Sequence, residues 1–308
     1  MDITPISVII PVRNEGDRII GAARSIVDGR SCCFPLELVL VDDASNDGAC
    51  ERLQEELGAR LETSLIVRRL VSWSGIPFAR NRGAEAASYP IFVITDANTR
   101  FLRNWDLPIR RHFSRERILA ATILDMASSF KGFGCALMLP SMGVTWIPVP
   151  HAYGGYVPIS ACTGTVIDRE SFRRLGGYDE SLPLYGAAEP ELSVRAWLCG
   201  YEIVNVPDLQ IYHRFRPRAE HDAFLASIDH VQLHNYLRFA CYYLPHDLLP
   251  QTCDYYARLH PGTFRQVWSD LYGSDVWERR AVLSGVLRRD FRWFAAHFPC
   301  LWNVETRR

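Results

Sequence analysis

The chain has 308 residues, 48% of them hydrophobic and 22% charged, which is the composition of an ordinary soluble globular protein with room for one large domain and an appendage. Its 34 basic and 35 acidic residues give a formal net charge of −1, so no bulk field attracts the chain to nucleic acid or to an anionic membrane. No apolar run reaches the roughly 18 residues of a membrane-spanning helix, so we expect no transmembrane segment.

Short apolar runs rich in valine and isoleucine alternate with helical patterns along the first third of the chain. These runs are too short for helices and predict three buried strands, over Ser7–Val12, Leu36–Val41 and Ile91–Thr95, and a further strand over Leu65–Leu70. Amphipathic spacing predicts helices over Asp17–Ser31 and Cys50–Leu57. The alternation predicts an α/β fold with a Rossmann-like, mostly parallel central sheet, helices on both faces, and ligands at the carboxyl ends of the strands.

Polar turns follow three of these strands. Arg13-Asn14-Glu15 follows the first, Asp42-Asp43 the second, and Asp96-Ala97-Asn98 the last. Any one of them alone would be an ordinary turn, but carboxylates at neighbouring strand ends repel one another unless a cation, a sugar or donor groups lie between them. Three in register therefore indicate a site, and the Asp96 and Asn98 oxygens could share a divalent cation that carries a diphosphate.

The middle of the chain is less clearly patterned. Pro140–Pro158 mixes proline, glycine and aromatic residues and is typical of a loop. Aromatic rings stack on sugar faces and glycines permit movement, so Trp146, Tyr153 and Tyr156 are candidates for a flexible lid over an acceptor. A surface loop with partly buried aromatic residues explains the same pattern equally well.

Regular patterning returns at Ser160 with a strand and then a helix over Arg169–Leu175 that a Gly-Gly pair ends. In the next helix we place Glu189 at the N-cap and Pro190 in the first turn, with Gly200 at the end. Glu191 and Arg195 form an i,i+4 pair on it. A strand over Glu202–Val206 follows, and Leu209–Phe215 leads to His213.

The composition shifts after Pro217. Ala219–Leu244 and Phe264–Phe298 are predicted to be helical and carry many aromatic residues, which we expect in the core or in a homodimer contact. We therefore divide the chain into a ligand-binding and catalytic domain, residues 1–217, and an α-helical C-terminal extension, residues 218–308.

The nine cysteines include no CxxC pair, and Cys32 and Cys33 are adjacent. An odd number without metal-binding spacing favours reduced thiols in a cytoplasmic protein. Met1 is followed almost at once by a predicted strand, so we expect no signal peptide. Peripheral attachment to an inner membrane stays open.

Four segments in this order, SVIIPVRNE, LVLVDDASNDG, GIPFARNRG and ITDAN, resemble the family 2 glycosyltransferases of the GT-A fold. TGTVIDRESFRRLGGYDESL, YGAAEPELSVRAWLCGYEI and VPDLQIYHRFRP strengthen this resemblance, and that half is also similar to the polypeptide N-acetylgalactosaminyltransferases. The resemblance covers about residues 5–217. It implies a GT-A fold and an enzyme that uses a nucleotide-sugar donor.

The resemblance also implies a set of donor-binding residues. Asp43 corresponds to the acid that accepts hydrogen bonds from uracil or another base, and Arg80 to the arginine near the base and the diphosphate; a surface arginine at a helix start is the alternative for Arg80. Phosphates could be held by basic side chains after the late histidine. The remaining positions of the implied donor site are Pro11, Arg13, Asn14, Glu15, Asp96, Arg214 and Arg216.

Asp96 and Asn98 match the family's DxD motif, and His213 matches the third ligand of Mn²⁺ or Mg²⁺ in several relatives. Asn98 is neutral where an acid is usual. Glu189 matches the general base that deprotonates the acceptor, and Glu191 is the rival position. Ala188 stands where the family carries a further acid, and a purely capping role is the alternative for Glu189.

The implied reaction is hexosyl transfer from a nucleotide sugar, expected to be a UDP-sugar, to a hydroxyl of a glycan, natural product, peptide or lipid. A base at Glu189 implies inversion, whereas the resemblance to the N-acetylgalactosaminyltransferases leaves retention open. Ala188 and Asn98 favour an alternative, a non-catalytic GT-A protein that binds a nucleotide sugar or a partner protein. A nucleotidyltransferase is disfavoured because PVRNEGDR contains no glycine-rich phosphate loop.

Overall fold

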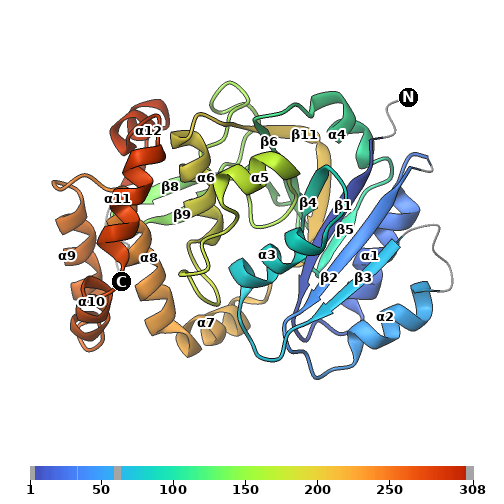
Figure 1. Cartoon of the computed structure of the whole chain (residues 1–308), viewed down its shortest axis with the longest axis horizontal. Helices are drawn as coiled ribbons and strands as arrows, with labels where there is room; N and C mark the ends of the chain where they lie inside the picture. The colour runs from blue at the N-terminus through green and yellow to red at the C-terminus, as the bar shows by residue number, and fades with distance from the viewer. Residues whose placement is uncertain (1–3, 33, 59–63, 303–308) are drawn as a thin grey trace.

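The computed structural model describes residues 4–32, 34–58 and 64–302 and is built around a nine-stranded sheet (Figure 1). The strands lie in the order β3-β2-β1-β4-β10-β6-β11-β5, and β7 pairs with β6. The four predicted N-terminal strands are confirmed as adjacent and parallel. The bounds are β1 Ile6–Val12, β2 Leu36–Asp42, β3 Ser64–Arg69, β4 Ile91–Ile94, β5 Thr99–Phe101, β6 Arg117–Asp125, β7 Lys131–Gly132, β10 Thr165–Asp168 and β11 Glu202–His213.

Helices cover both faces of this sheet, as predicted. Strand β1 alternates its side chains between two buried clusters: Val8 and Ile10 belong to the cluster that includes Leu53 of α2, while Ile9 belongs to the cluster that includes Leu192 of α6. Both faces of the sheet are therefore shielded from solvent, which explains the continuous apolar runs of the parallel strands. The helices before the C-terminal region are α1 Arg18–Gly29, α2 Ala49–Gly58, α3 Ile76–Ala86, α4 Asp106–His112, α5 Arg169–Leu175 and α6 Ala188–Leu198.

A second, three-stranded sheet lies beside the main one and consists of β8 (Cys135–Leu139), β9 (Gly143–Trp146) and β12 (Leu301–Trp302). Strand β9 falls inside the segment predicted to be a loop, and β6 and β8 fall in the stretch that showed little pattern. The hairpin of β8 and β9 is short, with Pro140 in its turn and Gly143 at the start of β9, which obscures the alternation of a strand.

Helix α6 begins earlier than predicted. Ala187 adopts a left-handed conformation with φ of 63° and occupies the N-cap, so the helix starts at Ala188. Glu189 therefore lies in the first turn and is not the cap. The predicted Glu191–Arg195 pair is confirmed, with 2.7 Å between the Arg195 Nη2 and Glu191 Oε2 atoms.

This ion pair is buried and ties three helices together. Arg195 donates further hydrogen bonds to the carbonyl oxygens of Leu175, at the end of α5, and Gly177. The Tyr243 hydroxyl of α8 donates to Glu191 at 2.6 Å. Glu191 is 0% exposed, so it offers no face to an acceptor, in contrast to the candidate role inferred from the sequence.

The C-terminal region forms six helices where two helical stretches were predicted (Figure 1). Gly273 ends one of them, and Pro245 lies in another break. Several C-terminal aromatic residues are core, among them Tyr242, Tyr243 and Phe298, whereas the three tryptophans of these helices pack against it partly buried and Tyr272 is exposed. The Trp197 ring of α6 lies 4.8 Å from that of Phe298. The division at residue 217 stays a prediction. The helices are α7 Arg218–Ser227, α8 Asp229–Tyr243, α9 Leu249–Leu259, α10 Phe264–Tyr272, α11 Val276–Val286 and α12 Phe291–His297.

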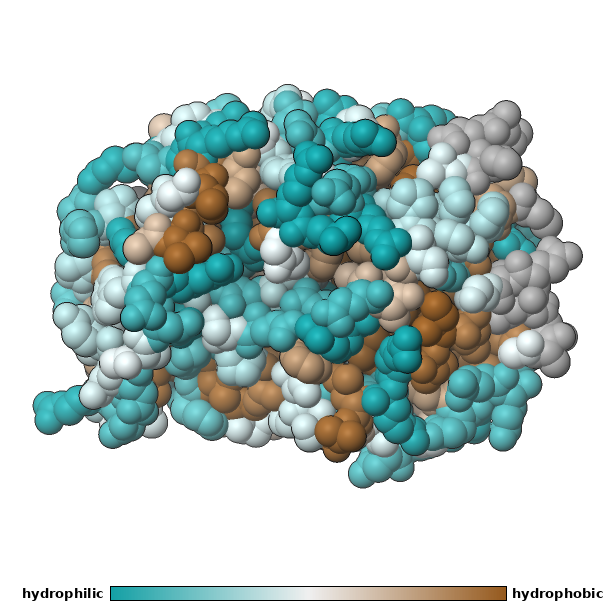
Figure 2. Space-filling view, viewed as in Figure 1, coloured by the Kyte–Doolittle hydropathy of each residue, from teal (hydrophilic) through white to brown (hydrophobic). Residues whose placement is uncertain are grey.

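The exterior is mixed in polarity. Figure 2 shows a face that is largely hydrophilic, with small hydrophobic patches separated by polar residues. Of the helices that the structure describes, none has the length and apolar character needed to cross a membrane. Eight cysteines carry free thiols, and Cys33 lies outside the described residues.

We expect Glu191→Ala to lower the free energy of unfolding by about 3–5 kcal/mol, because it leaves the Arg195 guanidinium buried without its counterion. Urea denaturation measures this loss. Glu170→Ala is the matched control, since Glu170 is exposed in its pair with Arg174 and should cost less than about 1 kcal/mol. Equal losses in the two variants would contradict a stabilising role of the buried pair.

Candidate functional site

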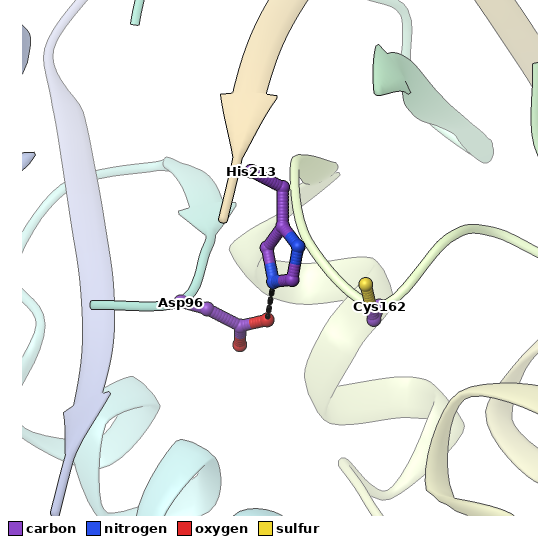
Figure 3. A group of neighbouring side chains, drawn as sticks. All are labelled: Asp96, Cys162 and His213. Atoms are coloured by element: carbon purple, nitrogen blue, oxygen red, sulfur yellow. Dashed lines mark ion pairs between the residues drawn. The ribbon is translucent and has the colours of Figure 1, made fainter. Parts of the chain in front are cut away.

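The sheet topology brings Asp96 and His213 together. Strand β4 runs antiparallel to β10, β10 antiparallel to β6, and β6 parallel to β11, so β4 and β11 end at the same edge of the sheet. Asp96 follows β4, and His213 is the last residue of β11. The His213 Nε2 and Asp96 Oδ2 atoms are 3.6 Å apart (Figure 3).

Asp96 is held on several sides. Its backbone N–H donates to Thr163 Oγ1 at 2.9 Å, and its Oδ1 accepts a hydrogen bond from Arg80 at 3.1 Å. Burial on its own would raise the pKa of Asp96, but its contact with His213 and the charge of Arg80 outweigh burial and keep that pKa below its ordinary value. The carboxylate is thus ionised and ready to bind a cation.

Arg80 is the buried centre of the site, with 1% of its side chain exposed. Its Nη1 donates to Glu189 Oε1 at 2.5 Å, and its Nη2 donates to Asp96 and, at 2.7 Å, to the carbonyl oxygen of Cys162. The guanidinium also lies 5.1 Å from the centre of the Tyr178 ring. Arg80 therefore joins the candidate metal ligand to the candidate base, a connection that the sequence did not reveal.

Small residues of α3 bring Arg80 to this position. Ala79 is 0% exposed, and a Cβ atom on Gly83 would lie 2.4 Å from the Ile9 Cγ2 atom, so only glycine lets the helix approach β1 this closely. The small residues of the segment ARNRG thus pack against β1 and place the Arg80 side chain at the strand ends. A surface position for Arg80, the alternative weighed above, is wrong.

The turns after β1 and β2 contact each other. Arg13 donates to the carbonyl oxygens of Asp43, at 2.6 Å, and Ala44, and its guanidinium lies over the Trp73 ring. Asn14 Oδ1 accepts a hydrogen bond from the backbone of Asn46. The predicted donor residues of these two turns therefore form one structural unit.

Asp43 is buried and accepts 2.7 Å hydrogen bonds from the backbone N–H groups of Ser74 and Gly75. These bonds hold the loop that precedes α3. The role of Asp43 toward a base stays a prediction, as do the roles of Pro11 in β1 and of Glu15, which pairs with Arg18.

Asn98 is oriented toward the end of β11. Its Nδ2 donates to the Arg214 carbonyl oxygen at 3.0 Å, and the Arg214 N–H donates to the Asn98 carbonyl oxygen. Arg214 is exposed beyond His213, whereas Arg216, also exposed, lies over the Phe224 ring. The side chain of Asn98 is thus engaged with the neighbouring strand.

Cys162 is a component that the sequence did not reveal. One ligand atom each from Asp96, Cys162 and His213 lies within 4.8 Å of the others. Cys162 precedes β10, whose Thr165 pairs with Ile94, so the start of β10 faces the end of β4. The antiparallel insertion of β10 into the sheet, which the sequence pattern did not predict, places the thiol at the site.

The candidate acceptor aromatics separate in the structure. Tyr156 pairs with Val204 near the start of β11, and Tyr153 packs against Phe298. His213 lies nine residues beyond Val204 on the same strand. A bulge in β11 shortens this span to six residues of the partner strand β6, which is roughly 20 Å. The two tyrosines therefore do not form a lid over the strand ends.

Trp146 lies close to the candidate metal ligands. Its ring contacts that of Phe215, which in turn lies 4.6 Å from the His213 ring. Phe130 completes this aromatic group. Of the three aromatic candidates, Trp146 alone is connected to the site by these contacts, and its role toward an acceptor stays a prediction.

Comparisons with known proteins agree with the motifs. Residues 7–139 match the family model described as glycosyl transferase family 2. Polypeptide N-acetylgalactosaminyltransferase 8 of Drosophila melanogaster is 29% identical over 229 residues, which are 68% of this chain and 38% of that protein. Polypeptide N-acetylgalactosaminyltransferase 13 of Homo sapiens is 24% identical over 312 residues, covering 94% of this chain and 53% of that protein. The chain thus spans about half the length of these relatives or less.

Solved structures share the fold. A crystal structure of GalNAc-T7 with UDP, GalNAc and Mn²⁺ has a TM-score of 0.76 at 20% identity, covering 96% of this chain and 56% of that chain. The mannosyltransferase PcManGT from Pyrobaculum calidifontis, in complex with GDP-Man and Mn²⁺, has a TM-score of 0.55 at 16% identity, covering 91% of this chain and 74% of that chain. The predicted GT-A fold and the family resemblance are confirmed, and the matches support a glycosyltransferase.

We expect Arg80→Met to lower the free energy of unfolding by about 3 kcal/mol, because the carboxylates of Asp96 and Glu189 lose their shared buried counterion. Arg82→Met, two residues along the same helix, is the control: Arg82 is 34% exposed in its pair with Glu180 and should cost less than about 1 kcal/mol. Urea denaturation distinguishes the two. A loss at Arg80 no larger than that at Arg82 would contradict a central role for the buried arginine.

Proposed function

We propose that this chain, whose residues 7–139 match glycosyl transferase family 2, is a metal-dependent glycosyltransferase that moves a sugar from a UDP-sugar to an acceptor hydroxyl. One observation carries the proposal: Asp96 and His213 face each other at the strand ends, and Arg80 links Asp96 to Glu189. Support also comes from GalNAc-T7 and PcManGT, whose structures contain Mn²⁺ with UDP or GDP-Man.

The residues at the strand ends fit a divalent cation. Asp96 supplies an ionised carboxylate and His213 an imidazole, a pair that suits Mn²⁺ better than Mg²⁺, which prefers oxygen ligands alone. The buried Nδ1 atom of His213 has no hydrogen-bond partner among the described residues. When bound, the cation would neutralise charge on the diphosphate leaving group.

Glu189 accepts the proton of the acceptor hydroxyl in this proposal. It lies in the first turn of α6, and 21% of its side chain is exposed to an incoming hydroxyl. Arg80 fixes its distance from Asp96. Attack by a hydroxyl deprotonated in this way is a single displacement and inverts the anomeric centre.

The second candidate function is a protein that binds a nucleotide sugar without transferring it. It is favoured by the close contact of Glu189 with a fully buried arginine, which competes with proton transfer, and by Ala188 in place of an acid.

The compartment we propose is the cytoplasm, supported by the free thiols of the eight described cysteines.

We expect UDP to raise the melting temperature only in the presence of Mn²⁺, and Asp96→Asn to abolish that shift. A ligand at 100 times its dissociation constant contributes about 2.7 kcal/mol, which a thermal melt resolves. GDP, dTDP and CMP are compared in the same way to identify the donor nucleotide. Asp208→Asn, in an exposed pair with Arg111, is the control and should keep the shift. A metal-dependent shift that survives in Asp96→Asn would remove Asp96 from the proposed metal site.

We expect Glu189→Gln to bind UDP and Mn²⁺ normally but to lose roughly 10²- to 10⁴-fold in kcat, because the amide can still bond Arg80 but accepts no proton. Sugar transfer is measured with a panel of acceptors, and NMR of the new glycosidic bond reports inversion. Glu180→Gln, an exposed acid, is the control. Full activity in Glu189→Gln, or retention at the anomeric carbon, would overturn the base assignment. Nucleotide binding without transfer by the unmodified protein would support the second candidate function.

A further inference from the structure

We propose that the thiolate of Cys162 is the third protein ligand of the cation, so that this site favours Zn²⁺ or Co²⁺ over Mg²⁺. The inference deepens the proposed function, because it concerns the same metal site. One ligand atom from each of Asp96, Cys162 and His213 lies within 4.8 Å of the others. In Figure 3 the His213 ring stands between the Asp96 carboxylate and the Cys162 thiol.

The backbone around Cys162 is fixed on both sides. Its own carbonyl oxygen accepts a 2.7 Å hydrogen bond from Arg80. The next residue, Thr163, accepts from the Asp96 N–H and shares a 2.7 Å hydrogen bond with Thr95. The thiol is therefore held beside Asp96 by the same contacts that hold Asp96 itself.

Gly164 permits this arrangement. It has a φ of 75°, and a Cβ atom on it would lie 2.5 Å from the Ala121 Cβ atom. Its N–H donates to the Ile94 carbonyl oxygen at 2.9 Å, which joins the loop to the end of β4. A side chain here would push the segment that carries Cys162 away from the strand ends.

Two further observations describe the other donor groups around the thiol. Asn98, the residue in the second position of the DxD-like motif, directs its amide nitrogen to the Arg214 carbonyl oxygen. His213 is 8% exposed, and its Nδ1 atom is buried with no hydrogen-bond partner among the described residues. The site thus combines a carboxylate, an imidazole with an unpaired nitrogen and a thiol, beside the Asn98 amide, whose nitrogen is bonded to the neighbouring strand.

The chemistry of these donors determines the metal preference. Thiolate and imidazole ligands suit Zn²⁺ and Co²⁺, whereas Mg²⁺ takes oxygen ligands almost exclusively. Binding converts the thiol to a thiolate and releases its proton to solvent, so charge and atoms balance. Three protein ligands leave coordination positions for the oxygens of a diphosphate.

Titration of the full chain with Co²⁺ under reducing, anaerobic conditions tests the proposal directly. We expect a near-ultraviolet thiolate-to-cobalt charge-transfer band in the unmodified protein, its loss in Cys162→Ser, and its displacement by Zn²⁺. Cys253→Ser is the matched control, because Cys253 is partly buried in α9 and is not a member of the cluster. Absence of the band in the unmodified protein, or its persistence in Cys162→Ser, would overturn the proposal.

A competition titration adds a second readout. We expect the ratio of Zn²⁺ to Mn²⁺ affinity to fall more than about tenfold in Cys162→Ser. An unchanged ratio of the two affinities in Cys162→Ser would show that the thiol does not set the metal preference, which would overturn that part of the proposal. Melting curves without metal establish that each variant is folded, and Cys162→Ala replaces the serine variant if that one is unfolded.

The UDP melting experiment keeps the two proposals separate. A nucleotide shift with Mn²⁺ but no cobalt band would leave the proposed function standing and reject the thiolate ligand. A cobalt band that depends on Cys162, with no nucleotide shift under any metal, would support the thiolate site and reject the donor site.

Discussion

A single buried guanidinium organises the strand-end site. Burial of an arginine is costly unless its charge is paired and its N–H groups are bonded. The two terminal nitrogens of Arg80 meet this condition with Asp96, Glu189 and the Cys162 carbonyl oxygen, whereas its buried Nε has no hydrogen-bond partner among the described residues. Those partners come from the end of β4, the start of α6 and the loop before β10. The arginine can be buried only when all three segments are in place, so formation of the site and folding of the two halves of the chain depend on each other.

The parts of the fold that the sequence predicts are those with strong local signals. Buried parallel strands have continuous apolar runs, and α5 has Asp168 as an N-cap and Gly176 in a left-handed conformation at its end, which together give its bounds correctly. Asp96 and His213 could be expected to meet, because each follows or ends a strand and a family resemblance pairs them. The strand directions place both residues at the same edge of the sheet, and in the structure their side chains are 3.6 Å apart.

Other features depend on contacts between distant residues and had no local signal. Arg80 is 16 residues from Asp96 and 109 from Glu189, so nothing in the ARNRG segment indicates what the guanidinium contacts. Cys162 reaches the site only because β10 is inserted antiparallel between β4 and β6. Tyr153 and Tyr156 were placed near the site by composition, but the length of β11 separates them from it.

Helix α6 contacts the strand-end site at its first turn and the C-terminal helical region at its last. Glu189 lies in its first turn, and Trp197, near its last residue, packs on Phe298 and Trp293 of the C-terminal region. Glu189 and Trp197 are eight residues apart, about 12 Å along the helix, so a tilt of about 5° pivoted at Trp197 moves Glu189 by roughly 1 Å. Displacements of about 1 Å alter rates about a hundredfold. The packing of Trp197 therefore sets the orientation of α6 and, with it, the position of Glu189. Substitutions in the C-terminal helices can change that position, although the residues that pack on Trp197 do not contact the strand-end site.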